Sequence, residues 1–261
     1  MKLLGQDVVG QDDLGRSHAW TLHRAWLADG REVFVKRGAD FAAEAAGLTW
    51  LGAPAVEVLY EGEGLLVLPW LPPERPTPAL AETFGRDLAA VHGAGAPSFG
   101  APWPGFIAEL PLDNTPDDTW ASWYAERRVL PYARMAFDRG VLTDRDVRRI
   151  EEKMSGLSDL GEPPSRIHGD LWSGNVHWSG GRARLIDPAA HGGHRETDLA
   201  MLALFGAPHL DRILAAYAEA APPAPGWRDR VALHQLHPLL VHCVLYGASY
   251  REQTLRALEK A

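Results

Sequence analysis

The stretch of sequence that decides the fold reads His168-Gly169-Asp170-Leu171-Trp172-Ser173-Gly174-Asn175. A short predicted strand, Val176-His177-Trp178, follows it. Because the turn at residues 179–181 then reverses the chain, the partner strand ends at Asp187, close to Asn175. Two carboxylates and an amide oxygen are therefore expected in one pocket. Phosphoryl transfer needs such a set, since one carboxylate accepts a hydroxyl proton and an Asn–Asp pair offers Mg²⁺ the hard oxygen ligands that it prefers.

The spacing His-x-Asp-x4-Asn, followed by a hairpin and an Asp, is typical of the catalytic loop and metal motif of kinase-like folds. Gly169 takes the place of the Arg that is usual in protein kinases, and Asp187-Pro188-Ala189 that of Asp-Phe-Gly. Both changes favour a small-molecule kinase over a protein kinase. The alternative is a loop of capping residues without a catalytic role, which the match of four positions in order and spacing disfavours.

Two charged residues in the N-terminal region complement this motif. Lys36 ends the alternating strand Val33-Phe34-Val35-Lys36, from which a cation can reach the phosphates of ATP. Glu44 follows eight residues later in a predicted helix and can pair with Lys36. Each alone would be read as a solvated surface charge, and the downstream motif is what favours a function. Residues 10–18 lack a full Gly-x-Gly-x-x-Gly, so they either cover the phosphates or are an ordinary connecting loop.

The predicted elements divide the chain into two parts. Four prolines within residues 72–78 can continue neither a strand nor a helix, and helical periodicity dominates beyond them. We therefore predict an α+β, bilobal protein-kinase-like fold, with an ATP-binding β-lobe over residues 1–71 and a mainly helical catalytic and substrate-binding lobe over residues 72–261. The predicted strands cover residues 17–27, 32–36, 56–60, 65–68, 166–167, 176–178 and 183–186, and the predicted helices 40–51, 80–92, 117–139, 144–154, 196–205, 209–220, 227–246 and 251–260.

Composition limits the classes of protein to which the chain can belong. With 46% hydrophobic and 23% charged residues in 261, it can bury a sizeable core. The net charge of −8 argues against a protein that coats nucleic acid or anionic membrane. No apolar run reaches the roughly 18 residues of a membrane span, and the N-terminus does not read as a signal peptide. We expect a soluble, cytoplasmic monomer with a buried, inert thiol at its single cysteine, Cys243.

The motifs resemble the fructosamine kinase (ketosamine 3-kinase) family, whose relatives are aminoglycoside phosphotransferases and choline kinases. The resemblance is carried by residues 168–175, 185–189 and 193–202, with weaker echoes in residues 29–36 and 41–48. It implies ATP- and Mg²⁺-dependent phosphorylation of the 3-hydroxyl of a ketosamine, which is a fructosamine, ribulosamine or erythrulosamine adduct of a free or protein-linked amine. The 3-phosphate makes the adduct labile, so the implied role is repair of glycation.

The same resemblance implies roles for individual residues. Asp170 resembles the catalytic base, Asn175 and Asp187 the metal ligands, and Lys36 and Glu44 the pair that positions ATP. His168 and Asp198 would brace the catalytic loop, and three neighbours are candidates for bracing or for the substrate pocket: His194, Arg195 and Glu196.

Two departures from the family pattern concern the ligands. Pro69 stands where relatives usually carry an acidic residue, which leaves the carbonyl of Pro69 and the amide of Leu71 to hold adenine. Leu112 and Asn114 stand where the family usually shows Gln-x-Asn, so Leu112 offers a polyhydroxy substrate no hydrogen bond, and Asn114 remains a candidate. Trp172 could pack against the ketosamine or close the pocket.

Other interpretations remain open or are disfavoured. A hydroxyl kinase acting on an aminoglycoside, choline or a related amino alcohol is the alternative enzyme. A nucleotide-binding pseudokinase is the alternative from another class, which the intact motif disfavours. A metal site on the helix with His234, His237 and His242 is disfavoured by their spacing. The pairs Arg127-Arg128 and Arg148-Arg149 are expected on solvated helix faces, and core packing is expected of the tryptophans at positions 20, 26, 120, 123 and 227.

Overall fold

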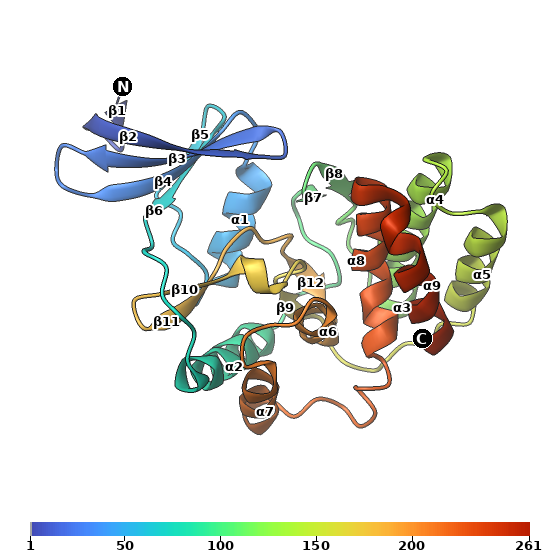
Figure 1. Cartoon of the computed structure of the whole chain (residues 1–261). Helices are drawn as coiled ribbons and strands as arrows, with labels where there is room; N and C mark the ends of the chain where they lie inside the picture. Colours follow the sequence, from blue (N-terminus) through green and yellow to red (C-terminus); the bar gives the residue numbers. More distant parts are fainter. Residues whose placement is uncertain (1) are drawn as a thin grey trace.

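An antiparallel sheet forms the first part of the molecule. The structure, a computed structural model, describes residues 2–261. Six strands lie in the order β1-β2-β3-β4-β6-β5, and most of the helices lie beyond the sheet (Figure 1). The strands are β1 (Lys2–Leu3), β2 (Gln6–Ser17), β3 (Trp20–Leu27), β4 (Glu32–Arg37), β5 (Tyr60–Gly62) and β6 (Leu65–Pro69).

Alternation along β4 gives the sheet two different faces. Val33 and Val35 point to one face, where they are fully buried with Ala25 of β3. The other face is covered by helix α1 (Ala42–Leu51), whose Leu48 packs with Leu66 of β6. Lys36 follows Val35 and therefore lies on the α1 face, at the side of the sheet that the rest of the molecule approaches.

Helices and three small sheets form the remainder. The helices are α2 (Pro78–Gly93), α3 (Trp120–Tyr124), α4 (Leu130–Asp138), α5 (Asp144–Ser155), α6 (Glu196–Leu204), α7 (Leu210–Ala220), α8 (Val231–Tyr246) and α9 (Arg251–Lys260), with a π-helical turn at Ala125–Val129 between α3 and α4. The two-stranded sheets pair β7 (Gly105–Ile107) with β8 (Leu110–Leu112), β9 (Ser165–Ile167) with β12 (His191–Gly193), and β10 (Val176–Ser179) with β11 (Arg182–Leu185). The predicted α+β class is confirmed.

Two apolar cores hold these helices. One joins α2 and α7 to the β10–β11 hairpin, and Phe84, Tyr217 and Leu185 in it are fully buried. The other joins α3 and α4 to α8, through buried side chains such as Trp120 and Leu240. The catalytic hairpin β10–β11 is thus anchored by its own apolar face, which leaves its polar loop free to face a ligand.

The proline-rich segment lies along the β10–β11 hairpin. The amide of Glu74 donates to the carbonyl of Trp178 (2.7 Å), and the Glu74 carboxylate accepts from the amide of Gly181 (2.8 Å). His177 Nε2 bonds to the carbonyl of Leu71 (2.8 Å). Thr77 then caps α2, whose first residue is Pro78. These contacts hold the segment where we predict the division of the chain, and the division itself stays a prediction.

Three sequence-based expectations for backbone structure need correction. The strand expected over residues 56–60 begins only at Tyr60. The segment before it does not join the sheet, because the amide of Val56 donates to the carbonyl of Leu185 (3.0 Å). The loop considered over residues 10–18 is mostly strand β2, and only the turn His18-Ala19 connects it to β3. Strands β7, β8 and β12 were not anticipated, since they are three residues long.

The expectation that Arg128 lies on a solvated face is wrong. Its side chain is 1% exposed, lies 4.0 Å over the ring of Trp123, and donates to the carbonyl of Asp113 and to Asn114 Oδ1, both at 2.6 Å. The π-helical turn shifts the register of the helix there and turns Arg128 inward. Trp120 and Trp123 are buried as expected, and so is Cys243, whose sulfur lies 3.3 Å from Thr254 Oγ1.

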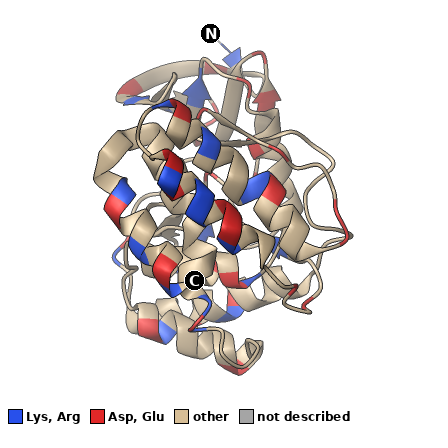
Figure 2. Ribbon diagram, turned by 90° about the vertical axis from the view of Figure 1, so that its right-hand side faces the viewer, with Lys and Arg blue, Asp and Glu red and all other residues tan. Residues whose placement is uncertain are grey.

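Charges on the face formed by α5 and α9 are mixed in sign. Figure 2 shows blue and red residues interspersed over these helices, and Arg148 pairs there with Asp144, as Arg256 does with Glu252. Arg148 is solvated, as expected. Across residues 2–261, each helix is too short or too polar to cross a membrane.

Candidate active site

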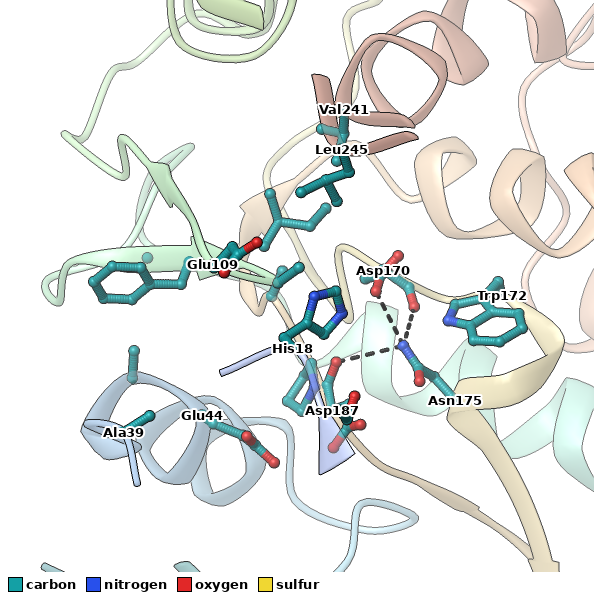
Figure 3. Close-up of a pocket in the computed structure, with 18 of the residues that line it drawn as sticks. His18, Ala39, Glu44, Glu109, Asp170, Trp172, Asn175, Asp187, Val241 and Leu245 are labelled. Carbon is teal, nitrogen blue, oxygen red and sulfur yellow. Dashed lines mark hydrogen bonds between the residues drawn. The ribbon is translucent and has the colours of Figure 1, made fainter. Parts of the chain in front are cut away.

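A cleft of about 830 Å³ lies between the sheet with α1 and the catalytic loop. It is lined from the first part of the chain by Lys36 and Glu44, and from the second by Asp170, Asn175 and Asp187. Figure 3 labels the last four of these. The five residues that the sequence motifs single out for chemistry thus face one space, although up to 151 positions separate them.

Lys36 joins the two sides of the cleft. Its side chain is 3% exposed, and Nζ donates to both carboxylate oxygens of Glu44, at 2.9 and 3.0 Å. Nζ also pairs with Oδ1 of Asp187. Burial opposes the charge on Lys36, but the carboxylates of Asp187 and Glu44 prevail and raise its pKa. The lysine is therefore charged, and it is held between Glu44 and Asp187.

Asp198 holds the backbone of the catalytic loop. It lies on α6, is fully buried, and accepts hydrogen bonds from the amides of His168 (2.7 Å) and Gly169 (3.0 Å). His92 Nε2 lies 3.0 Å from the same carboxylate. Three partners satisfy this buried carboxylate, so it can fix the loop that carries Asp170 without reaching the cleft itself.

His168 supports the loop from inside. Its Nδ1 accepts from the amide of Asp170 (3.2 Å), so the neutral ring carries its hydrogen on Nε2, which donates to the carbonyl of Ile186 (2.9 Å). Burial lowers the pKa of His168 and keeps the ring neutral. The imidazole therefore connects the residue before Asp187 to the residue expected to be the base.

The side-chain NH₂ group of Asn175 donates hydrogen bonds to Asp170 and Asp187. Nδ2 donates to the carbonyl of Asp170 (2.8 Å), to its carboxylate (3.1 Å) and to the carbonyl of Asp187 (3.5 Å), and Figure 3 draws these bonds as dashed lines. Within residues 2–261 no group donates to its Oδ1. Asp187 has a left-handed φ of 52°, and its side chain is 46% exposed. Such strain is common where a side chain must be aimed at a ligand.

Asp170 has the electrostatics of a base. Burial and the negative charge of Asp187 raise its pKa to about 7, and the hydrogen bond from Asn175 opposes that rise. A carboxylate with a pKa near the working pH can accept a proton and later release it.

A family model described as fructosamine kinase matches residues 16–261. The chain belongs to the fructosamine kinase family. Proteins named probable ketoamine kinase from Synechocystis and Thermus thermophilus are 32% and 33% identical to it, over 90% and 92% of this chain and 84% and 91% of theirs. Nineteen curated proteins match significantly.

Solved structures agree with this family and extend the fold to other kinases. A candidate fructosamine-3-kinase from Thermobifida fusca is 51% identical, with a TM-score of 0.94 over 99% of this chain and 95% of that one. A thermostable mutant of an aminoglycoside phosphotransferase, 15% identical, reaches a TM-score of 0.66 over 97% of this chain and 95% of its own. The protein-kinase-like fold is thereby confirmed.

The backbone conformation and the close neighbours of Gly169 explain why no Arg stands at this position of the catalytic loop. The φ of Gly169 is +81°, and a Cβ at this position would lie 2.3 Å from the carbonyl oxygen of Ala189. Trp172 is the exposed aromatic residue of the loop: its indole lies over Gly174 and lines the cleft, 41% exposed. The loop thus combines a position that excludes side chains with an aromatic ring directed to the ligand.

We expect Gly169→Ala to lower the free energy of unfolding by about 2–5 kcal/mol, because it combines a left-handed Cβ with a backbone clash. Gly181→Ala is the matched control: its φ is +70°, but nothing lies within 4 Å of its Cβ, so about 1–2 kcal/mol is expected. Urea unfolding of both variants measures the difference. Equal losses in the two would contradict the close approach of Ala189.

His194, Arg195 and Glu196, which the resemblance makes candidates for bracing or for the substrate pocket, do not line the cleft. Arg195 forms two bonds of 2.7 Å to Glu162, and Glu196 is bound at both oxygens by Arg230. Burial opposes ionisation of Glu196, but the neighbouring His234, whose Nε2 lies 3.4 Å away, and the hydrogen bonds from Arg230 lower its pKa to about 2. The structure thus places Arg195 and Glu196 in ion pairs that tie α6 to the segments around it.

His194, Glu196 and His234 resemble a metal site, since one ligand atom of each lies within 4.8 Å of the others. However, Nδ1 of His194 accepts from the amide of Glu196 (3.3 Å), so the neutral ring carries its hydrogen on Nε2 and has no lone pair there for a metal. Arg230 already neutralises the carboxylate. We therefore interpret these three residues as part of the packing between helices and not as a metal site.

Several predicted ligand residues lie away from the cleft lining. Pro69 is paired with Val33 in the sheet, and the carbonyl of Leu71 is bound by His177, so a role with adenine stays a prediction. Asn114 is 4% exposed and held by Arg128, and Leu112 is buried in the core. The structure does not bring Asn114 and Leu112 to the cleft.

The cleft also contains residues that sequence reasoning missed. Glu109 lies at the β7–β8 turn, and four rings come from the α6 end, α8 and beyond: Phe205, His242, Tyr246 and Tyr250. The sequence carries no separate signal for Glu109, and the four rings lie in or beside predicted helices, where they cannot be distinguished from core positions without the fold.

Proposed function

We propose that this protein transfers the γ-phosphoryl group of ATP to the 3-hydroxyl of a ketosamine, and that the reaction serves deglycation. The proposal is supported by membership of the fructosamine kinase family and by one observation above all: Lys36, Asp170, Asn175 and Asp187 face a single cleft. In the transfer, the acceptor oxygen bonds to the γ-phosphorus, the bond to the β–γ bridging oxygen breaks, and ADP leaves. Asp170 takes the proton of the hydroxyl.

The protein's residues divide the remaining work. Lys36, held by Glu44, neutralises phosphate charge, and His168 with Asp198 keeps Asp170 at a fixed position. The oxygens available for Mg²⁺ are Oδ1 of Asn175 and the carboxylate of Asp187, which is half-exposed. They are hard ligands and fit that ion. When bound, Mg²⁺ would neutralise charge on the phosphates.

The product would decompose in a way that frees the amine. A phosphate on carbon 3 lies next to the carbonyl at carbon 2, and after enolisation it leaves as inorganic phosphate more readily than a hydroxyl does. Addition of water to the resulting imine releases the amine and leaves a dicarbonyl sugar. This sequence is why phosphorylation at this carbon would serve repair of glycated amines.

A substrate panel tests the proposal. ADP release would be measured with ATP, Mg²⁺ and fructosamine, ribulosamine and erythrulosamine adducts, alongside aminoglycosides and choline. We expect turnover with ketosamines, and phosphorus–carbon coupling in the NMR spectrum of the product should place the phosphate on carbon 3. Turnover with aminoglycosides or choline alone would support the alternative hydroxyl kinase. Nucleotide binding without any turnover would support the pseudokinase.

A further inference from the structure

The cleft is acidic for a site proposed to bind ATP. Its lining includes five carboxylates, from Asp40, Glu44, Glu109, Asp170 and Asp187, but one lysine and no arginine. Four of these have partners: Lys36 for Glu44 and Asp187, Asn175 for Asp170, and the amide of Ala42 for Asp40. Within residues 2–261, no hydrogen bond or ion pair engages Glu109. An exposed carboxylate facing a ligand cleft without a partner can bind a cation that comes with the ligand.

The backbone presents Glu109 to the cleft. The turn between β7 and β8 consists of Ala108 and Glu109, and Ala108 has a left-handed φ of 50°, which disfavours any residue with a Cβ. In Figure 3, the side chain of Glu109 extends from this hairpin, at some distance from the group formed by Asp170 and Asn175. The chain therefore accepts local strain at the turn that places this carboxylate.

An aromatic cluster, Phe205-His242-Tyr246-Tyr250, forms a wall of the same cleft. His242 lies at its centre, with ring centroids 5.1 Å from Phe205, 5.3 Å from Tyr246 and 4.8 Å from Tyr250. Seven large apolar side chains are exposed among residues 2–261, and four of them line the cleft: Phe106, Trp172, Phe205 and Tyr246. Exposed aromatics gathered at one cleft indicate a binding surface.

Glu109, Asp170 and the cluster share an electrostatic environment. Burial raises the pKa of Tyr246, and after it Tyr250, Asp170 and Glu109 raise it further. The phenol of Tyr246 therefore lies within electrostatic reach of the carboxylate expected to be the base and of the unpaired one. A group bound over this ring would be near both.

We propose that Glu109 and the aromatic cluster bind the amine end of the acceptor: Glu109 pairs with its secondary ammonium, and the cluster packs against an apolar or aromatic substituent on that nitrogen. The inference rests on the proposed function, since a ketosamine has an ammonium one carbon from its carbonyl. Carboxylate pairing and aromatic faces both favour a cation, and the rings also favour apolar groups. The preferred acceptors are thus ketosamines of apolar or aromatic amines, in contrast to those of amino acids with an anionic carboxylate near the nitrogen.

Three fructose derivatives test the subsite: the N-benzyl adduct, its ether analogue with oxygen in place of nitrogen, and the glycine adduct. We expect kcat/KM for the N-benzyl adduct to exceed that for the ether analogue and that for the glycine adduct by a factor of about ten or more. In Glu109→Gln, the ratio of kcat/KM for the N-benzyl adduct to kcat/KM for its ether analogue should fall to near unity. The KM for ATP should stay unchanged. Phe205→Leu with Tyr246→Leu should lower kcat/KM for the N-benzyl adduct more than for an N-methyl adduct.

Matched controls lie outside the cleft. Glu219→Gln, on the exposed side of α7, and Tyr60→Leu, an exposed ring on β5, should leave all ratios unchanged. An unchanged preference for nitrogen in Glu109→Gln would overturn the subsite while leaving the proposed function intact. Failure of the unmodified protein to phosphorylate any ketosamine would overturn the proposed function instead. Calorimetric binding of the N-benzyl adduct would then decide the subsite, because affinity that Glu109→Gln does not weaken would overturn it.

Discussion

Replacing Asp170 with alanine is expected to lower kcat by about 10²–10⁴-fold, the range for loss of a general base, while ATP still binds. Asp170 accepts one hydrogen bond at its carboxylate, from Asn175, and lies in the cleft beside Asp187. The backbone of the loop is held by Asp198 and His168, so the loop should keep its shape without this carboxylate. Steady-state turnover with a ketosamine and fluorescence titration with a nucleotide analogue measure the two effects.

Asp211→Asn is the matched control for this experiment, since Asp211 is exposed on α7 and outside the cleft. It should leave turnover and nucleotide affinity as they are. Asp170→Asn keeps the shape of the side chain but not its basicity, and should be as slow as Asp170→Ala. Near-normal turnover in either Asp170 variant would sink the assignment of the base.

Replacing Lys36 with methionine is expected to lower kcat/KM for ATP by about 10²–10³-fold, as removal of a group that stabilises transition-state charge does. It should also lower the free energy of unfolding by about 3–5 kcal/mol, because Glu44 is left buried beside Asp187 without its cation. Urea unfolding and ATP kinetics on the same preparation separate the two consequences.

The double variant Lys36→Met with Glu44→Gln distinguishes structure from chemistry. Neutralising Glu44 removes the uncompensated charge, so stability should largely return while kcat/KM for ATP stays low. Lys260→Met, at the exposed end of α9, controls for the loss of a positive charge. Recovery of activity together with stability would show that Lys36 acts only by holding the fold.

Much of the candidate site was predictable because its residues lie close to one another in the sequence. Asp170 and Asn175 lie on one loop, and Asp187 lies at the end of the hairpin that follows it, so their proximity needs no knowledge of the rest of the chain. Lys36 near the end of β4 and Glu44 in the first turn of α1 are only eight residues apart, so their pairing could also be expected from the sequence.

The residues that sequence reasoning misplaced depend on distant contacts. Arg128 reads as a surface charge in a helical pattern, but a π-helical turn and the carbonyl of Asp113 bring it inside. Asn114 reads as a substrate ligand, but its Oδ1 is bound by that same arginine. A pattern of apolar and polar residues does not record which buried partner will satisfy a polar group.

The sequence by itself was enough to predict the residues proposed for phosphoryl transfer, since a strand, a loop and a hairpin fix them relative to one another through short-range backbone geometry. Only the tertiary structure decided which residues face the acceptor. Glu109, Phe205 and Tyr246 come from a hairpin and two helices that meet through long-range packing of the second apolar core and its rim. Specificity is therefore encoded in how the helices pack, and chemistry in how one short stretch folds.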